Sequence, residues 1–167
     1  AEELRELFLF VPSAVAFSFV GAIAALVAFI DTGETFKGLV WFSFSVVVLF
    51  VRGVTGLAYR QTPKPVADPA FWTRMMLIGN LLAGVQWGLL GTVCYPAAHN
   101  YRELFTVLVI TSFVAGSITA FSAVKWMHLA MAIPASVPPA IYIFFIRDGS
   151  NWLGGSMAIF FVCCVLY

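Results

Sequence analysis

The feature that most constrains this chain is a series of long apolar stretches separated by short polar segments. A helix that crosses a bilayer needs about 20 predominantly apolar residues. The sequence predicts six such spans, over Leu7–Ile30, Leu39–Tyr59, Trp72–Tyr95, Leu104–Val124, Trp126–Ile146, and Trp152–Tyr167 and onward. None of the segments between them is long enough to form a domain.

Composition indicates that these stretches need a bilayer. Only 10% of the residues are charged and 62% are hydrophobic, whereas a soluble domain has about 25% charged residues. We therefore expect an all-α membrane protein. The connections "DTGETFKG", "PAAHNYRE" and "RDGSN" carry turn residues, so six helices in three hairpins are expected. The net charge of +1 gives no basic surface for nucleic acid.

The lysines and arginines near the span ends predict the orientation. Six lie on the side of the N-terminus and three on the other, which places the N-terminus in the cytoplasm. An even number of spans then places the C-terminus there as well. The last apolar run stops at Tyr167 without a polar flank. We interpret residues 1–167 as one transmembrane domain, the N-terminal part of a longer polypeptide.

The third span contains two carboxamides among glycines, in "NLLAGVQWGLLG". Asn80, Gly84, Gly88 and Gly91 recur at helical spacing, and Gly84 to Gly88 is a GxxxG step that allows close helix approach. This face predicts a packing seam, either within the bundle or between two protomers. Gln86 projects about 120° away from Asn80, so it faces a second helix or a cavity.

Two further features suggest a ligand site inside the bundle. Arg52 lies about two turns inside the second span. It either extends to the headgroups or stays inside, paired with a carbonyl group or a ligand anion. Pro134, Pro138 and Pro139 remove backbone donors from the fifth span, which predicts a kink and either a cavity or a hinge.

The residues offer little for catalysis or for a cofactor. The sequence contains no nucleotide-binding loop, paired carboxylates or nucleophile triad. The two histidines, His99 and His128, are predicted on opposite sides of the membrane, and every lysine lies at a span edge. We expect no metal, no cofactor and no catalytic residue in this segment.

Several motifs together resemble a known family. They are "ELRELFLFVPSAV" at the first span, Arg52, Gly84-x-x-Trp87-Gly88 and Tyr95-Pro96 in "FWTRMMLIGNLLAGVQWGLLGTVCYP", "AGSITAFSA", and "IPASVPP". The chain resembles the six-helix membrane sensory input domains fused to bacterial diguanylate cyclases, often with a phosphodiesterase domain, and to some sensor histidine kinases. The resemblance implies a homodimer in the bacterial inner membrane that controls cyclic di-GMP synthesis or, next, a histidine kinase.

These observations define the candidate site and its rival interpretation. The residues predicted to contact a signal, a small hydrophobic ligand or membrane lipid, are Arg52, Asn80, Gln86, Trp87, Ser117, Pro134 and Pro138. The rival is a small transporter or channel-like protein built from helical hairpins. It would also account for the broken fifth helix.

Overall fold

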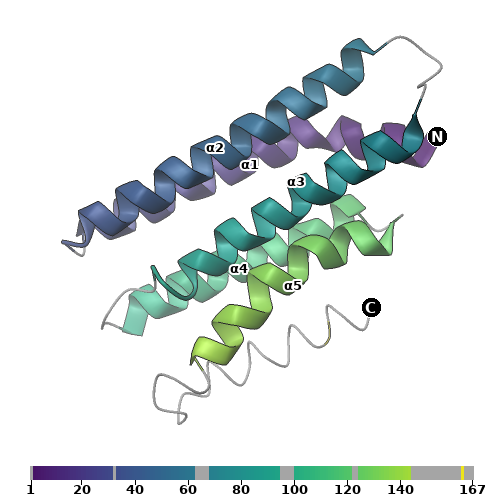
Figure 1. The fold of residues 1–167 in the computed structure, drawn as a ribbon. Coiled ribbons are helices and arrows are strands. Elements are labelled where there is room, and N and C mark those ends of the chain that lie inside the picture. The colour runs from purple at the N-terminus through teal and green to yellow at the C-terminus, as the bar shows by residue number, and fades with distance from the viewer. Residues whose placement is uncertain are drawn as a thin grey trace.

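The structure of the chain is a computed structural model, which describes residues 2–31, 33–62, 68–94, 100–121, 124–143 and 163. All regular secondary structure in this part of the chain is helical, as the sequence predicts (Figure 1). The helices are α1 (Glu2–Asp31), α2 (Thr35–Gln61), α3 (Pro69–Leu90), α4 (Asn100–Phe121) and α5 (Lys125–Ile141).

Local sequence signals define several helix ends. The Asp68 side chain accepts a hydrogen bond from the Phe71 N–H at 3.1 Å and caps α3, and Pro69 follows at the first helical position. Gly33 turns the chain between α1 and α2 with a φ of 76°, which glycine adopts without steric cost. At its other end α3 stops at Leu90 rather than at the predicted Tyr95, because the chain turns over residues 91–94.

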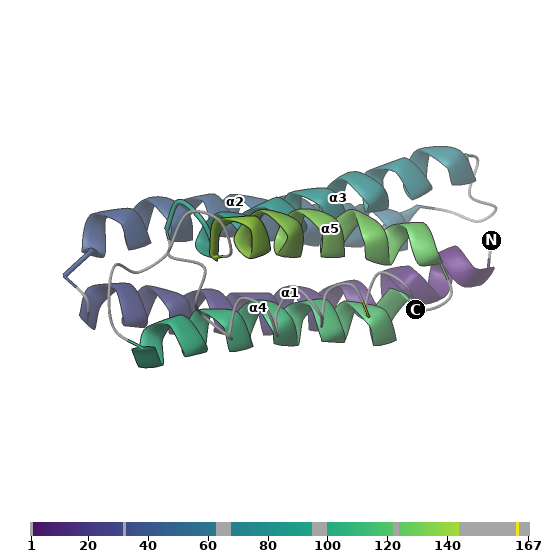
Figure 2. The ribbon, with the colours of Figure 1, turned by 90° about the horizontal axis from the view of Figure 1, so that it is seen from below.

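The helices form two layers (Figure 2). One layer contains α2, α3 and α5, with α3 in the middle, and the other contains α1 and α4. Helix α1 packs mainly on α2, and α4 packs mainly on α5. The first predicted hairpin, α1 with α2, is therefore confirmed.

The second predicted hairpin differs from the prediction. Helix α3 makes only a slight contact with α4 and packs most extensively on α5. The physical reason lies in its glycines, which let the backbone of α5 approach more closely than side chains would. The partner expected for α5, over Trp152–Tyr167, lies outside the described residues apart from Cys163.

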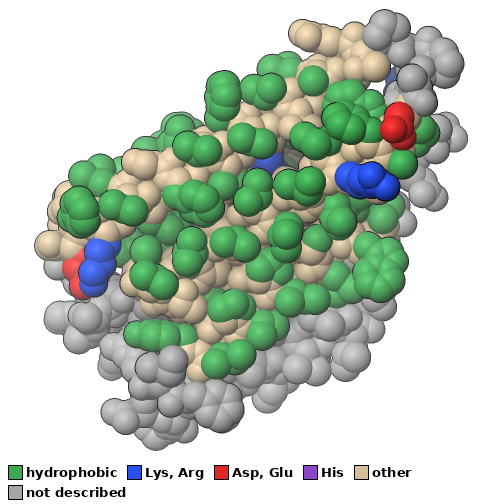
Figure 3. All heavy atoms as spheres, viewed as in Figure 1, with side chains coloured by type: hydrophobic (Ala, Val, Ile, Leu, Met, Phe, Trp, Pro, Cys, Tyr) green, Lys and Arg blue, Asp and Glu red, His purple; other side chains and the backbone are tan. Residues whose placement is uncertain are grey.

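Two of the described helices are long and apolar enough to cross a bilayer, over Arg5–Asp31 and Thr35–Gln61. Their outer faces carry many exposed large hydrophobic side chains, among them Phe17, Val20, Val47 and Phe50. Figure 3 shows hydrophobic side chains over most of the visible face and charged ones mostly near its two ends.

The interior combines apolar with polar side chains. The apolar core includes Phe8, Trp41, Trp87 and Ile110. The polar and charged side chains buried alongside it are Ser18, Ser45, Arg52, Asn80, Gln86, Thr106, Ser117, His128 and Ser136. A surface this rich in exposed large hydrophobic side chains, with an arginine buried inside, is unusual for a soluble domain.

Candidate ligand site at Arg52

Arg52 points into the bundle. Only 5% of the residue is exposed, and its Nη2 donates a hydrogen bond to Oδ1 of Asn80 at 3.2 Å. The alternative in which Arg52 extends to the headgroups is therefore wrong. The reason is that the face of α2 carrying Arg52 meets Gly79 of α3, whose missing side chain leaves room for the arginine stem.

Asn80 connects Arg52 to a third helix. While its Oδ1 accepts from Arg52, its Nδ2 donates to the backbone carbonyl of Met127 in α5 at 3.3 Å. Asn80 is completely buried. One carboxamide thus joins α2, α3 and α5 through two hydrogen bonds, at the packing seam that the sequence predicts on this face.

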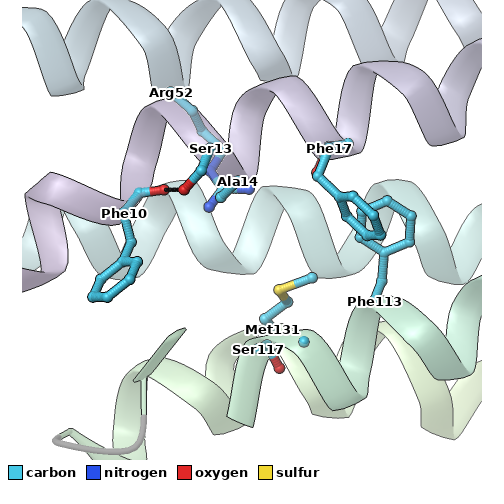
Figure 4. A pocket seen from close by; sticks show the side chains of 10 residues that line it. Phe10, Ser13, Ala14, Phe17, Arg52, Phe113, Ser117 and Met131 are labelled. Carbon is cyan, nitrogen blue, oxygen red and sulfur yellow. Dashed lines mark hydrogen bonds between the residues drawn. The ribbon is translucent and has the colours of Figure 1, made fainter. Parts of the chain in front are cut away.

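A cavity of about 430 Å³ opens beside Arg52. Figure 4 shows Arg52 reaching toward Ser13 and Ala14 of α1, with Phe17 and Phe113 close together at one side. The residues that line the cavity are Phe10, Ser13, Ala14, Phe17, Ser18, Arg52, Phe113, Gly116, Ser117 and Met131. The volume falls in the range of small-molecule sites, about 300–1,000 Å³.

Exposure separates the rim of this cavity from its floor. Phe10 and Phe17 of α1 are 50% and 59% exposed and form the rim. Arg52, Ser117 and Met131 are buried and lie deeper. A ligand would therefore enter between apolar side chains and meet the positive charge inside.

Ser117 lies in this cavity, as predicted, and has two polar neighbours. Its hydroxyl donates to the carbonyl of Val114 at 2.7 Å, and its Oγ lies 2.8 Å from Nδ1 of His128. Other hydroxyls of α4 also donate to carbonyls of their own helix, such as Thr111 to Val107 at 2.6 Å. Serine and threonine hydroxyls in helices commonly bond to carbonyls of their own helix in this way.

The glycine seam packs on α5 within one chain. A Cβ atom added at Gly84 would lie 2.5 Å from Cγ of Pro134, and one at Gly91 would lie 2.5 Å from Cγ of Pro139. At Gly88 it would overlap the backbone carbonyl oxygen of Pro134. Of the two alternatives for the seam, the structure has the one within the bundle.

The prolines act through this seam more than through the cavity. Helix α5 continues past all three prolines to Ile141 and bends along its length (Figure 1). Pro138 has no N–H, so the carbonyl of Pro134 loses its donor four residues on. That carbonyl faces Gly88. Pro134 is half-buried and Pro138 is exposed, and neither lines the Arg52 cavity.

Gln86 and Trp87 lie apart from the cavity. Both are completely buried, and neither lines it. The ring of Trp87 stacks on Phe113 with centroids 3.9 Å apart and meets Trp41 edge-on at 5.5 Å. The backbone carbonyl of Gln86 accepts from Trp41 Nε1 at 2.8 Å. The side-chain polar atoms of both residues have no hydrogen-bond partner among the described residues.

The structure thus brings together Arg52, Asn80 and Ser117 from the predicted set. Sequence reasoning missed the phenylalanine and serine side chains that α1 contributes. Their spacing offered a signal, because Phe10, Ala14 and Phe17 recur on one helical face. The described residues contain no group of three side chains that could hold a metal ion.

Comparisons with protein-family models, curated proteins and solved structures give no match for the chain. By its fold and its site the protein is an α-helical bundle that has two helices able to span a membrane and a buried arginine at an apolar cavity.

Proposed function

We propose that residues 1–167 form a membrane-embedded sensory domain that controls a cytoplasmic output module. The proposed output is a diguanylate cyclase that makes cyclic di-GMP, with a sensor histidine kinase as the second choice. The proposal includes six spans in the bacterial inner membrane, both termini in the cytoplasm, and a homodimer. The motif resemblance and the distribution of lysine and arginine support these parts.

The observation that carries the proposal is the path from the cavity to α5. Arg52 at the cavity bonds to Asn80, and Asn80 bonds to the backbone of α5 at Met127. A ligand that bonds to the remaining N–H groups of Arg52 acts on the same side chain that bonds to Asn80. Such a ligand shifts an equilibrium between two packings of the bundle only if it binds one of them better. In this proposal the Asn80 bonds hold Arg52 and α5 in one of the two packings, so the ligand binds the two packings with different affinity.

Helix α5 supports the proposal as the moving part. Three prolines remove hydrogen bonds that would otherwise hold it straight, and its contact with α3 places Pro134 and Pro139 against glycines of α3. In the proposed topology α5 leads directly into the sixth span, which ends in the cytoplasm. A shift of α5 would therefore reach the output module through one connection.

Two experiments test the proposal. The first fuses reporters after Tyr167: alkaline phosphatase, which is active outside the cytoplasm, and green fluorescent protein, which is active inside. We expect fluorescence without phosphatase activity. The second determines the reading frame beyond Tyr167, where an output domain supports the sensor and a stop codon supports the transporter. Phosphatase activity at Tyr167 would rule out the proposed sensor.

A variant tests the path itself in the full-length protein. Asn80→Leu removes both bonds and should change cyclic di-GMP output, measured in cell extracts. Thr73→Val is the matched control on α3, because the Thr73 hydroxyl is exposed and its partner within the described residues is the Pro69 carbonyl of its own helix. Unchanged output in a folded Asn80→Leu protein would contradict the path from Arg52 to α5.

A further inference from the structure

We infer that the cavity between α1 and α4 binds a single acyl chain that ends in an anionic oxygen group, with that group on the Arg52 guanidinium and the chain between Phe10, Phe17 and Phe113. This inference deepens the proposed function by naming its ligand class. It rests on that proposal only for the role of the ligand as a signal.

Arg52 carries a positive charge inside the bundle. No carboxylate of the described residues pairs with Arg52, and the ion pair within them joins Lys37 to Glu34 at the other end of α2. Moving an unpaired charge out of water is costly, so buried charges are usually paired. Charged side chains at membrane depth often mark the site of a ligand. An anion in the cavity supplies the missing partner.

Arg52 has N–H groups to spare for a ligand in the cavity. A guanidinium group has five N–H donors, and Asn80 is the hydrogen-bond partner of Arg52 within the described part of the chain. The Ser13 and Ser117 hydroxyls already donate to carbonyls of their own helices. Among the residues that line the cavity, Arg52 therefore supplies the charged donors for an incoming group. Its planar fork matches the two oxygens of a carboxylate or phosphate.

The walls of the cavity suit an apolar chain. Most of the lining side chains are apolar, and the two phenylalanines at the rim are about half exposed. A small hydrophilic anion would leave these walls without contacts. An acyl chain fills them, while its head lies at the floor beside Arg52. A free fatty acid satisfies this chemistry with its carboxylate on Arg52, and an anionic phospholipid does so with its phosphate on Arg52 and one chain in the cavity.

The test uses the chain in phosphatidylcholine nanodiscs and a long-chain fatty acid that carries a diazirine. After photolysis at alkaline pH, peptides from residues 10–18 and 106–117 are analysed by mass spectrometry. We expect crosslinks there, and competition by unlabelled fatty acid at concentrations at least about tenfold lower than by the fatty alcohol of equal length. Tenfold is the effect of one charged hydrogen bond.

Matched variants locate the site. Arg52→Gln should reduce binding of the acid to that of the alcohol, and Arg60→Gln, an exposed arginine of the same helix, should not. Gly116→Leu should remove both crosslinks by filling the cavity. A Cβ atom there meets nothing within 4 Å, and the rest of the leucine side chain can extend into the cavity that Gly116 lines. Gly53→Leu is its control, because its site is equally open and does not line the cavity.

Competition by phosphatidylglycerol decides the source of the ligand. If that lipid displaces the probe, the occupant is a bilayer phospholipid, and if it does not, the occupant is a free fatty acid. Equal competition by acid and alcohol would overturn the inference, as would crosslinks that persist in Gly116→Leu. Because crosslinking needs no output module, its failure is distinct from failure of the sensor proposal.

Discussion

The glycine seam between α3 and α5 gives the sharpest prediction of stability. Gly88→Ala places a methyl group on the carbonyl oxygen of Pro134, which belongs to the backbone and cannot rotate away. The two helices must separate or shift. Inserting a group into a packed interior typically costs about 1–3 kcal/mol. Alanine also stabilises a helix by about 1 kcal/mol relative to glycine, which offsets part of this cost.

A matched substitution removes the second term. Gly53→Ala gains the same helix propensity, and its methyl group meets nothing within 4 Å. The free energy of unfolding of Gly88→Ala should therefore lie about 1–3 kcal/mol below that of Gly53→Ala. Unfolding with sodium dodecyl sulfate in mixed micelles, followed by far-ultraviolet circular dichroism, measures the difference.

The result that refutes this reasoning is equally specific. If both variants unfold at the same detergent fraction, the α3–α5 contact is looser than the structure indicates. If Gly88→Ala instead lowers only the dimer fraction, with unfolding unchanged, the seam lies between protomers. Gly84→Ala should behave like Gly88→Ala, because the Met131 carbonyl oxygen occupies the equivalent place.

Four other predictions use the same unfolding assay or cysteine labelling. Asn80→Leu should destabilise the bundle by about 1–2 kcal/mol, because it loses two hydrogen bonds. Gln86→Met should leave the stability equal or higher, because the Gln86 amide has no partner in the described chain. A destabilised Gln86→Met protein would reveal such a partner. Trp87→Ala should cost about 3–5 kcal/mol, since the ring is fully buried, and a loss below about 1 kcal/mol would contradict that packing. With native cysteines replaced, Phe36→Cys should react with an impermeant maleimide in intact cells and Gln61→Cys only after permeabilisation; the reverse pattern would invert the proposed topology.

Much of the helical organisation follows from local sequence. The apolar run from Leu7 predicts α1. In the structure this helix begins at Glu2, because the short amphipathic segment before Leu7 is helical too. Asp68 and Pro69 mark the start of α3 by their side chains alone. Such signals act within a few residues, so one sequence is enough to detect them.

The packing partners did not follow from the sequence, because they depend on helices far apart in the chain. A GxxxG step predicts a close neighbour without saying which one, so the choice of α5 for the glycine face needed the fold. The direction of Arg52 likewise depends on Gly79, which lies on another helix. The cavity is lined by residues of both α1 and α4, and no local sequence pattern shows that Phe17 and Phe113 lie in the same cavity.

The contact between the Pro134 carbonyl and Gly88 has a genetic consequence that involves Pro138. Pro138 deprives the Pro134 carbonyl of its helical donor, and the oxygen rests against the bare α-carbon of Gly88. An alanine at 138 restores the donor, draws the oxygen back into the helix and opens a gap of about one methyl group. Pro138→Ala should accordingly act as a second-site suppressor of Gly88→Ala, so two positions fifty residues apart would be inherited as a pair.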